Sequence, residues 1–315
     1  MHGFALPAST SPCFYEAARV ADGIDSILGD LRDAARVLDV VESIKPEVVF
    51  HLAAQAIVKE GYRDPVGTMA TNVMGTVNLL EAVRSAGSIK SLLVVTSDKC
   101  YQNQEWLWPY RENEPMGGRD PYSVSKACAE LVTAAWRDSY LQDTTATATA
   151  RAGNIIGGGD WALNRLIPDA LKAWQEGAPL TIRFPRAVRP WQYVLDGLAG
   201  YIMLAAELAQ GRHVGACNFG PIDADMLSVE SLLQRLADAW GPPAQWVADP
   251  SPQPHEALLL RLDSSKARAE LGWKTHFSID QSIEAIIAWQ RAWLHGEDMR
   301  QFSLKQIDQY VGQTQ

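Results

Sequence analysis

The chain has 315 residues, of which 47% are apolar and 21% are charged, a composition typical of a soluble globular protein. Acidic residues outnumber basic ones by 37 to 28 and give a net charge of −9, which argues against non-specific binding to nucleic acid. The four cysteines form no CxxC pair and no apolar run reaches the roughly 18 residues of a membrane span, so we expect a cytoplasmic protein without a metal site or a membrane partner.

Strands and helices alternate in the first half of the chain. The short valine-rich runs at 46–52 and 91–96 predict buried strands, and the alternating run at 144–151 predicts a third. Apolar spacing predicts a helix over 68–86, and Asp120 followed by Pro121 marks the start of another that continues through Tyr140. Strands and helices in this order indicate a parallel sheet with helices on both faces.

The second half of the chain is less regular. Three glycines at 157–159 and several prolines between 168 and 190 precede helical patterns at 228–240 and 279–293. This composition favours a smaller, partly helical domain over the carboxyl ends of the strands, where open α/β sheets bind ligands. We expect a dinucleotide-binding domain of residues 1–153 plus about 190–222, and a substrate domain of residues 154–189 plus about 223–315.

Tyr122 and Lys126 are four residues apart on the second predicted helix, so their side chains share one face. A lysine ammonium beside a phenol favours the phenolate and lowers a tyrosine pKa that starts near about 10. We therefore expect Tyr122 to act as a base near neutral pH. The same spacing also occurs on solvated helix faces, so the pair needs support from its surroundings.

A serine, an aspartate and a lysine follow the strand predicted over 91–96. Ser97, Asp98 and Lys99 therefore lie at the carboxyl end of a buried strand, beside the expected crevice. A buried acid next to an amine needs a partner or a chemical task. An ion pair that closes the sheet edge and a catalytic pair are both open at this point.

Ser97 together with Tyr122-x-x-x-Lys126 resembles the catalytic set of the short-chain dehydrogenases/reductases. Further runs of the sequence resemble extended members of that superfamily and follow one another in the order found there. These runs are TSDKCY, GGRDPYSVSK, RAGNIIGGGDW, RLIPD and RPWQYV. The Asp98-Lys99 pair resembles the CDP-glucose 4,6-dehydratases, whereas dTDP-glucose dehydratases carry Asp-Glu there. The resemblance spans nearly the whole chain and implies a Rossmann-like, doubly wound parallel sheet with a smaller substrate-binding domain.

The resemblance also implies the cofactor, NAD, and the residues that bind it. Residues in the matched cofactor segments are Asp30, Leu31, Leu52, Ala53, Ala54, Asn72, Tyr122 and Lys126. The matched substrate-binding positions are Gln55, Asn154, Arg165, Arg189 and His255. For Arg183, a surface role and a ligand role are equally open.

The implied reaction removes water from CDP-glucose to give CDP-4-dehydro-6-deoxy-glucose, for deoxysugars of surface polysaccharides. The resemblance makes Tyr122 the base for the C4 hydroxyl, Ser97 a hydrogen-bond donor to the C4 oxygen, and Lys126 the group that polarises Tyr122 and holds the ribose of NAD. Asp98 can protonate the departing C6 hydroxyl if burial keeps it neutral. Lys99 is either a neutral base at C5 or a charged group that stabilises an enolate, and both alternatives stay open.

The chain departs from the resembled family at its start. Such enzymes open with a strand, a glycine-rich turn and a helix that stabilise the pyrophosphate of NAD, and no G-x-x-G-x-x-G or G-x-G-x-x-G follows an early strand here. Gly3-Phe4-Ala5-Leu6 instead resembles the end of the family's second strand. We therefore expect one strand, one turn and one helix, on the order of 30 residues, to be missing from this sequence.

Two alternatives accompany this interpretation. One is another nucleotide-sugar epimerase or dehydratase, which would keep Tyr122 and Lys126 without needing the Asp98-Lys99 pair. The other is an inactive, truncated chain that binds a nucleotide sugar. In either case the family resemblance implies a homodimer through a four-helix bundle, for which 68–86 and 122–140 are the predicted helices.

Overall fold

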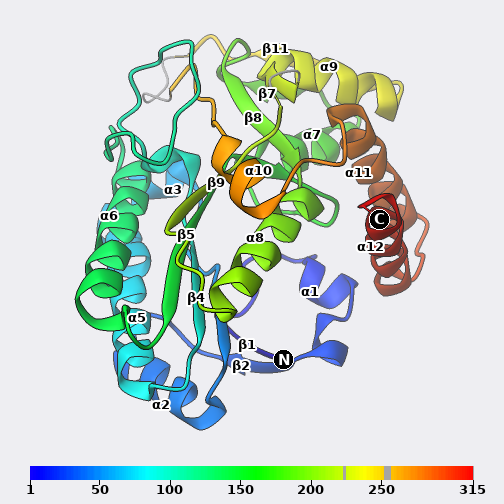
Figure 1. Ribbon diagram of the computed structural model, residues 1–315. Coiled ribbons are helices and arrows are strands. Elements are labelled where there is room, and N and C mark those ends of the chain that lie inside the picture. The colour runs from blue at the N-terminus through cyan, green and yellow to red at the C-terminus, as the bar shows by residue number, and fades with distance from the viewer. Residues whose placement is uncertain (223–224, 252–256, 315) are drawn as a thin grey trace.

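The computed structural model describes residues 1–222, 225–251 and 257–314, which form an α/β fold (Figure 1). The strands in chain order are β1 (His2–Ala5), β2 (Asp25–Leu28), β3 (Val48–His51), β4 (Ser91–Val95), β5 (Ala146–Ala152), β6 (Asn154–Ile156), β7 (Leu180–Ile182), β8 (Val188–Tyr193), β9 (Ala216–Phe219), β10 (Met226–Ser228) and β11 (Trp246–Ala248). The helices are α1 (Phe14–Ala17), α2 (Ala34–Ile44), α3 (Val58–Arg63), α4 (Pro65–Met69), α5 (Gly75–Ala86), α6 (Pro121–Trp136), α7 (Leu166–Gln175), α8 (Val194–Ala209), α9 (Val229–Trp240), α10 (Ser265–Leu271), α11 (Ile279–Leu294) and α12 (Met299–Thr314). Within this fold, π-helical turns at Ala70–Met74 and Arg137–Leu141 continue the helical stretches around α5 and α6.

The predicted parallel sheet is present, in the strand order β3-β4-β5-β9. Its central strands are buried on both faces, as Leu92, Leu93 and Ala148 show. α2, α5 and α6 cover one face, and α8 packs against β4 and β5 on the other (Figure 1). The expected helices on both faces are therefore confirmed, because near-continuous apolar strands require cover on each side.

β1 and β2 form a separate parallel pair. Within the described residues, no strand pairs with the second edge of β1 or with the outer edge of β3. The strand predicted over 46–52 is therefore present but not fully buried, and Val48 and Phe50 are each 39% exposed. The expectation of complete burial is wrong here because β3 is the edge strand of its sheet.

Capping residues fix the start of the helix that carries Tyr122 and Lys126. The Asp120 carboxylate accepts a hydrogen bond from the Ser123 backbone N–H at 2.9 Å, and Pro121 occupies the first turn. Gly87 ends α5 with φ of 61°, a left-handed conformation that suits glycine. Both predicted boundaries are confirmed.

A second layer lies over the carboxyl ends of the main sheet. It contains the three-stranded sheet β10-β8-β6 and the pair β11-β7. α7, α9 and α11 pack around a shared apolar core that includes Trp174, Leu232 and Ile286. The helices predicted over 228–240 and 279–293 are thus confirmed as α9 and α11.

Candidate active site

A cavity of about 560 Å³ lies between the carboxyl ends of β4 and β5 and the strands β7 and β8. It is the place where an open α/β sheet binds its ligand. The predicted site residues that line it are Leu52, Ala54, Ser97, Asp98, Lys99, Tyr122, Lys126, Asn154, Arg165 and Arg189. Separate segments of the sequence, from residue 52 to residue 189, therefore meet around one space.

The predicted catalytic residues come from the end of β4 and the first turns of α6. Ser97, Asp98, Tyr122 and Lys126 are all buried, and Lys99 is half-buried. A short 3₁₀ turn after β4, Asp98–Cys100, is capped by the Ser97 hydroxyl, which accepts from the Lys99 N–H at 3.2 Å. The turn directs these neighbouring side chains to a common cavity although they follow one another in sequence.

Burial, rather than Lys126, controls the acidity of Tyr122. Loss of solvent raises the pKa of Tyr122 to about 12, and a hydrogen bond with Ser97 acts in the opposite direction. The expectation of a lowered tyrosine pKa is therefore wrong for this chain without ligands. Four-residue spacing places the two side chains on one face but does not reveal how completely the phenol is desolvated.

Lys126 is itself perturbed by its surroundings. Burial lowers the pKa of Lys126 to about 8, while the negative charge of Glu130 raises it. Its Nζ donates to the Val95 carbonyl at 3.3 Å. Burial, assisted by the Lys126 charge, lowers the pKa of His51 to about 3, so His51 is neutral, and its Nε2 lies 3.0 Å from the Thr76 hydroxyl.

Asp98 is a buried carboxyl group with only one of its two oxygens hydrogen-bonded within the described residues. It is only 1% exposed, and its Oδ1 accepts from the Ser97 hydroxyl at 2.9 Å. Its Oδ2 is buried without a hydrogen-bond partner among the described residues. A buried carboxyl oxygen without a partner favours a ligand hydroxyl as the missing contact.

Asn72 and Gln55 lie behind the cavity rather than in its lining. The Asn72 amide donates to the Gln55 carbonyl and to the Ser125 hydroxyl, at 2.9 and 2.8 Å. The Gln55 amide donates to the Thr68 hydroxyl at 2.8 Å. These contacts tie the loop after β3 to α4 and α6, so both side chains support the site, and their direct binding roles stay predictions.

The turn after β2 lies outside the cavity lining. Asp30 accepts two hydrogen bonds from the Arg32 guanidinium, which holds the pKa of that carboxyl below its usual range. The Leu31 carbonyl accepts from Asn78 on α5 at 2.8 Å. Asp30 and Leu31 are therefore fixed at the carboxyl edge of β2, and Ala53 is likewise absent from the lining.

Three arginines from the second layer supply positive charge to their side of the cavity, and the charge of Arg165 also acts on Tyr122. Arg165, Arg183 and Arg189 all line the cavity. Arg189 is buried and donates to the Val188 carbonyl at 3.0 Å, whereas Arg165 is partly exposed and 4.0 Å from Asp160. Guanidinium groups bind phosphate oxygens in pairs, so this side suits a diphosphate. His255 lies outside the described residues.

Several residues of the site were not selected from the sequence. Asn164, Asp169 and Thr181 line the cavity, and burial raises the pKa of Asp169. Glu130 lies behind Lys126 on α6. A signal for Glu130 was present, because it follows Lys126 by the same four residues that separate Lys126 from Tyr122.

Neither metal nor membrane chemistry is indicated by the described residues. Among them, no group of three His, Cys, Asp or Glu side chains has an arrangement that could hold a metal ion. No described helix combines the length and apolar composition needed to span a membrane.

Sequence comparisons match this chain to nucleotide-sugar dehydratases. The family described as GDP-mannose 4,6 dehydratase matches residues 14–286. The CDP-glucose 4,6-dehydratase of Salmonella typhimurium is 46% identical over 320 residues, which cover 99% of this chain and 89% of the relative. A dTDP-glucose 4,6-dehydratase of Xanthomonas campestris is 26% identical, with 86% and 80% covered.

Solved structures agree in fold. A UDP-glucose 4-epimerase from Thermotoga maritima superposes with a TM-score of 0.79 at 20% identity, covering 93% of this chain and all of the other. A dTDP-glucose 4,6-dehydratase from Streptomyces venezuelae, solved with NAD bound, gives a TM-score of 0.75 at 24% identity, with 87% and 81% covered. At these identities the likeness establishes the Rossmann-like fold.

Proposed function

The chain belongs to the GDP-mannose 4,6 dehydratase family, and on that premise we propose that it is a lyase that converts CDP-D-glucose to CDP-4-dehydro-6-deoxy-D-glucose and water with NAD as cofactor. The observation that carries the substrate is the 46% identity to the Salmonella typhimurium CDP-glucose 4,6-dehydratase over 99% of this chain. The Asp98-Lys99 pair in the cavity supports a dehydration, because loss of water next to a ketone requires an acid at the departing hydroxyl and a base at the neighbouring carbon.

The residues present suit the nicotinamide and ribose end of NAD. Lys126 donates one hydrogen bond within the described structure, which leaves N–H donors for ribose hydroxyls beside Tyr122. Leu52 and Ala54 give the same side of the cavity an apolar wall. The chemistry that NAD would supply when bound here is reversible hydride transfer, from C4 of the sugar and back to C6. The described residues include no glycine-rich turn after β1, so we assign no contacts to the diphosphate of NAD.

The chain's own residues supply the proton transfers. Tyr122 removes the proton of the C4 hydroxyl, and Ser97, which hydrogen-bonds Tyr122, donates to the C4 oxygen as it becomes a carbonyl. Asp98 protonates the C6 hydroxyl through the oxygen that has no partner in the described residues. Lys99 lies at the same rim and acts on the hydrogen at C5, which the C4 ketone makes acidic.

The part of the cavity proposed to bind CDP-glucose carries positive charge, which complements the negative diphosphate. Arg165 and Arg189 bind the diphosphate of CDP-glucose, and Asn154 binds the sugar. Gln55 supports the site from outside the cavity lining through its bond to Thr68, and the predicted substrate contact of His255 falls outside the described residues. Sheet membership supports the expected domain division: β9 joins the main sheet, whereas β6, β7, β8, β10 and β11 form the second layer. We propose residues 1–153 plus about 190–222 as the cofactor domain and 154–189 plus about 223–315 as the substrate domain. β8 (Val188–Tyr193) crosses the expected boundary near 190 and pairs with strands of the second layer.

Turnover of CDP-glucose is the first prediction. Incubation of the chain with CDP-glucose and NAD⁺ is expected to give a product lighter by one water, seen by mass spectrometry, with a ketone at C4. dTDP-glucose, UDP-glucose and GDP-mannose are the control substrates. Formation of CDP-galactose, or turnover of another nucleotide sugar in place of CDP-glucose, would identify a different family reaction. Calorimetry that detects CDP-glucose binding without turnover would favour the inactive binder.

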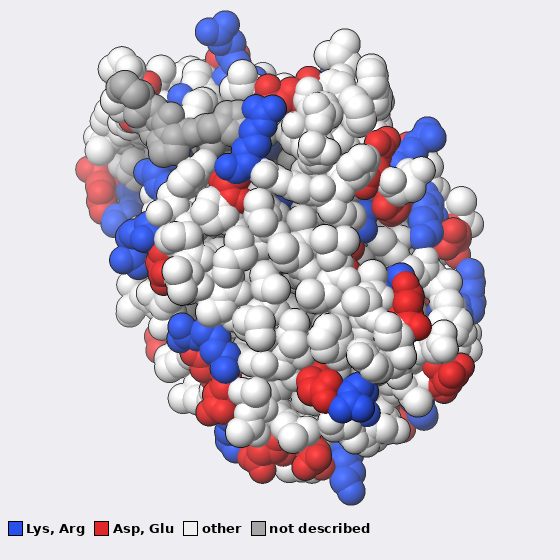
Figure 2. All heavy atoms as spheres, turned by 90° about the vertical axis from the view of Figure 1, so that its left-hand side faces the viewer, with Lys and Arg blue, Asp and Glu red and all other residues white. Residues whose placement is uncertain are grey.

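The outer face of α5 and α6 suits a homodimer through a four-helix bundle. The centre of this face carries few charged side chains, whereas Lys, Arg, Asp and Glu gather around its rim (Figure 2). Leu131 on α6 is 57% exposed, and Met74, next to α5, is 53% exposed. Apolar side chains gathered on paired helices are typical of an interface. The four unpaired cysteines accord with a cytoplasmic protein.

Leu131→Arg is expected to convert a dimer into a monomer, because it places a charge at an exposed apolar position of α6 within the proposed interface. Light scattering coupled to gel filtration measures the mass directly. Leu294→Arg, at the exposed end of α11 on another face, is the matched control and should leave the mass unchanged. A Leu131→Arg chain that keeps the mass of a dimer would place the interface elsewhere.

A further inference from the structure

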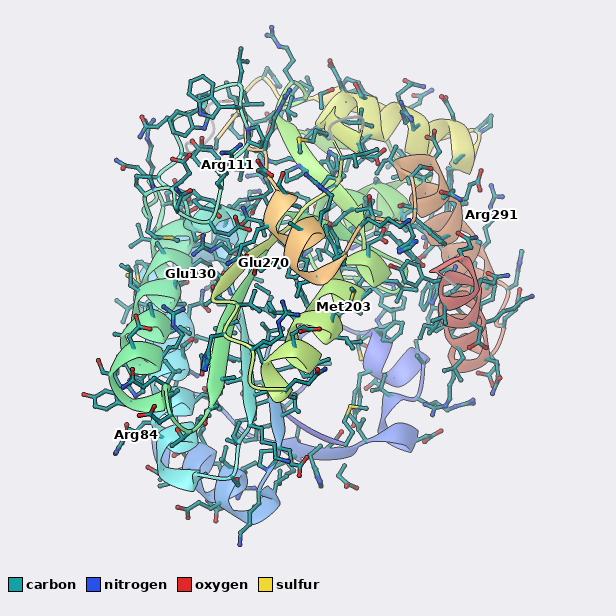
Figure 3. All side chains as sticks on the ribbon, viewed as in Figure 1. Arg84, Arg111, Glu130, Met203, Glu270 and Arg291 are labelled. Atoms are coloured by element: carbon teal, nitrogen blue, oxygen red, sulfur yellow. The ribbon has the colours of Figure 1, made fainter. Side chains whose placement is uncertain are left out.

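A buried carboxylate connects the two segments that carry the catalytic residues. Glu130, labelled on α6 in Figure 3, is 4% exposed and lies one helical turn beyond Lys126. One of its oxygens accepts a short hydrogen bond from the hydroxyl of Thr96, the residue before Ser97. The other accepts from the Thr149 hydroxyl at 2.7 Å and from the Arg151 guanidinium at 2.8 Å. The side chain therefore joins α6 to the ends of β4 and β5.

Arg151 extends this connection to the far side of the catalytic segment. Its guanidinium donates to the Tyr101 hydroxyl at 2.9 Å and to the Glu112 carbonyl at 3.0 Å, and it stacks 5.1 Å from the centre of the Tyr101 ring. Tyr101 in turn donates to Asn218 on β9 at 2.6 Å. Residues 97–99 are thus held from both ends, by Thr96 bound to Glu130 and by Tyr101 bound to Arg151.

Besides joining these segments, the Glu130 carboxylate acts electrostatically on Lys126. The charged and titratable groups around it are Lys126 on its own helix, Arg151 on β5, and Cys100 after β4. Its charge raises the pKa of Lys126 against the lowering effect of burial. A buried ion pair adds little net stability relative to apolar packing. The stability of the fold alone therefore does not explain why Glu130 and Arg151 form a buried ion pair beside the catalytic residues.

We propose that Glu130 is a positioning residue for the dehydration proposed above: together with Arg151 it fixes Ser97, Asp98 and Lys99 against Tyr122, and it places a carboxylate one helical turn beyond Lys126. The inference rests on the proposed function for its kinetic part, and on the position of Glu130 one helical turn beyond Lys126 for its effect on the Lys126 ammonium.

Three isosteric variants separate geometry from charge. Thr96→Val removes the link to the catalytic segment but leaves the Glu130–Arg151 pair intact, and it is expected to lower kcat by about 10- to 100-fold with KM within twofold. Glu130→Gln removes both the charge and the pair. Thr133→Val is the matched control, because the buried Thr133 hydroxyl donates within α6 to the Ala129 carbonyl, and kcat should stay within twofold.

Competitive labelling with acetic anhydride, followed by mass spectrometry of the Lys126 peptide, reports the protonation of Lys126 without requiring turnover. The labelling midpoint is expected near pH 8 for the wild type, Thr96→Val and Thr133→Val. For Glu130→Gln it is expected at least one pH unit lower, because the anion that favours the ammonium is gone.

The proposal is overturned if Thr96→Val keeps its kcat, if Thr133→Val loses as much, or if the Glu130→Gln midpoint stays at the wild-type value. Should Glu130→Gln fail to fold, Thr96→Val still decides the positioning role. A wild-type chain that does not turn over CDP-glucose would refute the proposed reaction, while the labelling midpoints would still test Glu130.

Discussion

Tyr122→Phe is expected to lower kcat for CDP-glucose by about 10²- to 10⁴-fold, the usual contribution of a positioned general base. The phenol is buried in the cavity and hydrogen-bonded to Ser97, so phenylalanine removes one oxygen while the ring remains packed. KM should change little, because the arginines proposed to bind the diphosphate belong to other elements and are unchanged in this variant. The measurement is the rate at which the product lighter by one water forms, with binding followed by calorimetry.

The pH dependence gives a second signature of Tyr122. Burial raises the pKa of Tyr122 to about 12, so below that pH the base is mostly protonated and its phenolate fraction increases with pH. kcat/KM of the wild type is therefore expected to rise from pH 6 towards pH 8, where Lys126 begins to lose its proton. Tyr122→Phe should lose this rise.

Tyr193→Phe supplies the matched control for Tyr122→Phe. Tyr193 is another buried tyrosine, on β8, and it stacks on Phe277 outside the cavity lining. Its variant should keep the wild-type rate and pH dependence. A Tyr122→Phe enzyme with more than a tenth of wild-type kcat would show that another group accepts the C4 proton.

The central strands and the helix α6 could be predicted because the apolar and capping patterns in their own sequences match their positions in the fold. The apolar run before Ser97 forms β4 in the centre of the sheet, and Asp120 with Pro121 begins α6 as its capping pattern predicts. β3 differs, since its valine-rich run predicts two buried faces although Val48 and Phe50 are partly exposed. Apolar content predicts a strand, but which strand lies at an edge depends on pairings that the local sequence does not contain.

Site residues could be predicted from the sequence where polar residues follow a predicted strand or where two of them are four residues apart on a predicted helix. Ser97, Asp98, Tyr122 and Lys126 were found in this way, and the structure brings them to one cavity. The pKa of Tyr122 was predicted in the wrong direction, because desolvation depends on residues from several elements. The four-residue spacing from Lys126 points to Glu130, but its partners Thr96, after β4, and Thr149, on β5, become neighbours only after the sheet forms.

Asp98→Asn is expected to block loss of water while leaving the earlier proton transfer at C5 active. The asparagine oxygen can still accept the hydrogen bond from Ser97 that Asp98 Oδ1 accepts at 2.9 Å. The amide nitrogen would take the place of the buried Oδ2, and an amide can donate a hydrogen bond but cannot transfer a proton to the C6 hydroxyl. kcat for the dehydrated product should therefore fall by about 10²- to 10⁴-fold.

Solvent exchange at C5 distinguishes Asp98 from Lys99. In heavy water, CDP-glucose recovered from Asp98→Asn is expected to carry deuterium at C5, because Lys99 remains in the cavity and the C4 ketone still makes that hydrogen acidic. Lys99→Met should lose both the exchange and the product. Asp225→Asn, which alters a buried carboxyl that accepts from Ile279 outside the cavity, should behave as wild type. Equal loss of exchange and of water elimination in Asp98→Asn would contradict the assignment of Asp98 to the C6 hydroxyl, since an acid that acts only on the departing oxygen leaves the chemistry at C5 reversible.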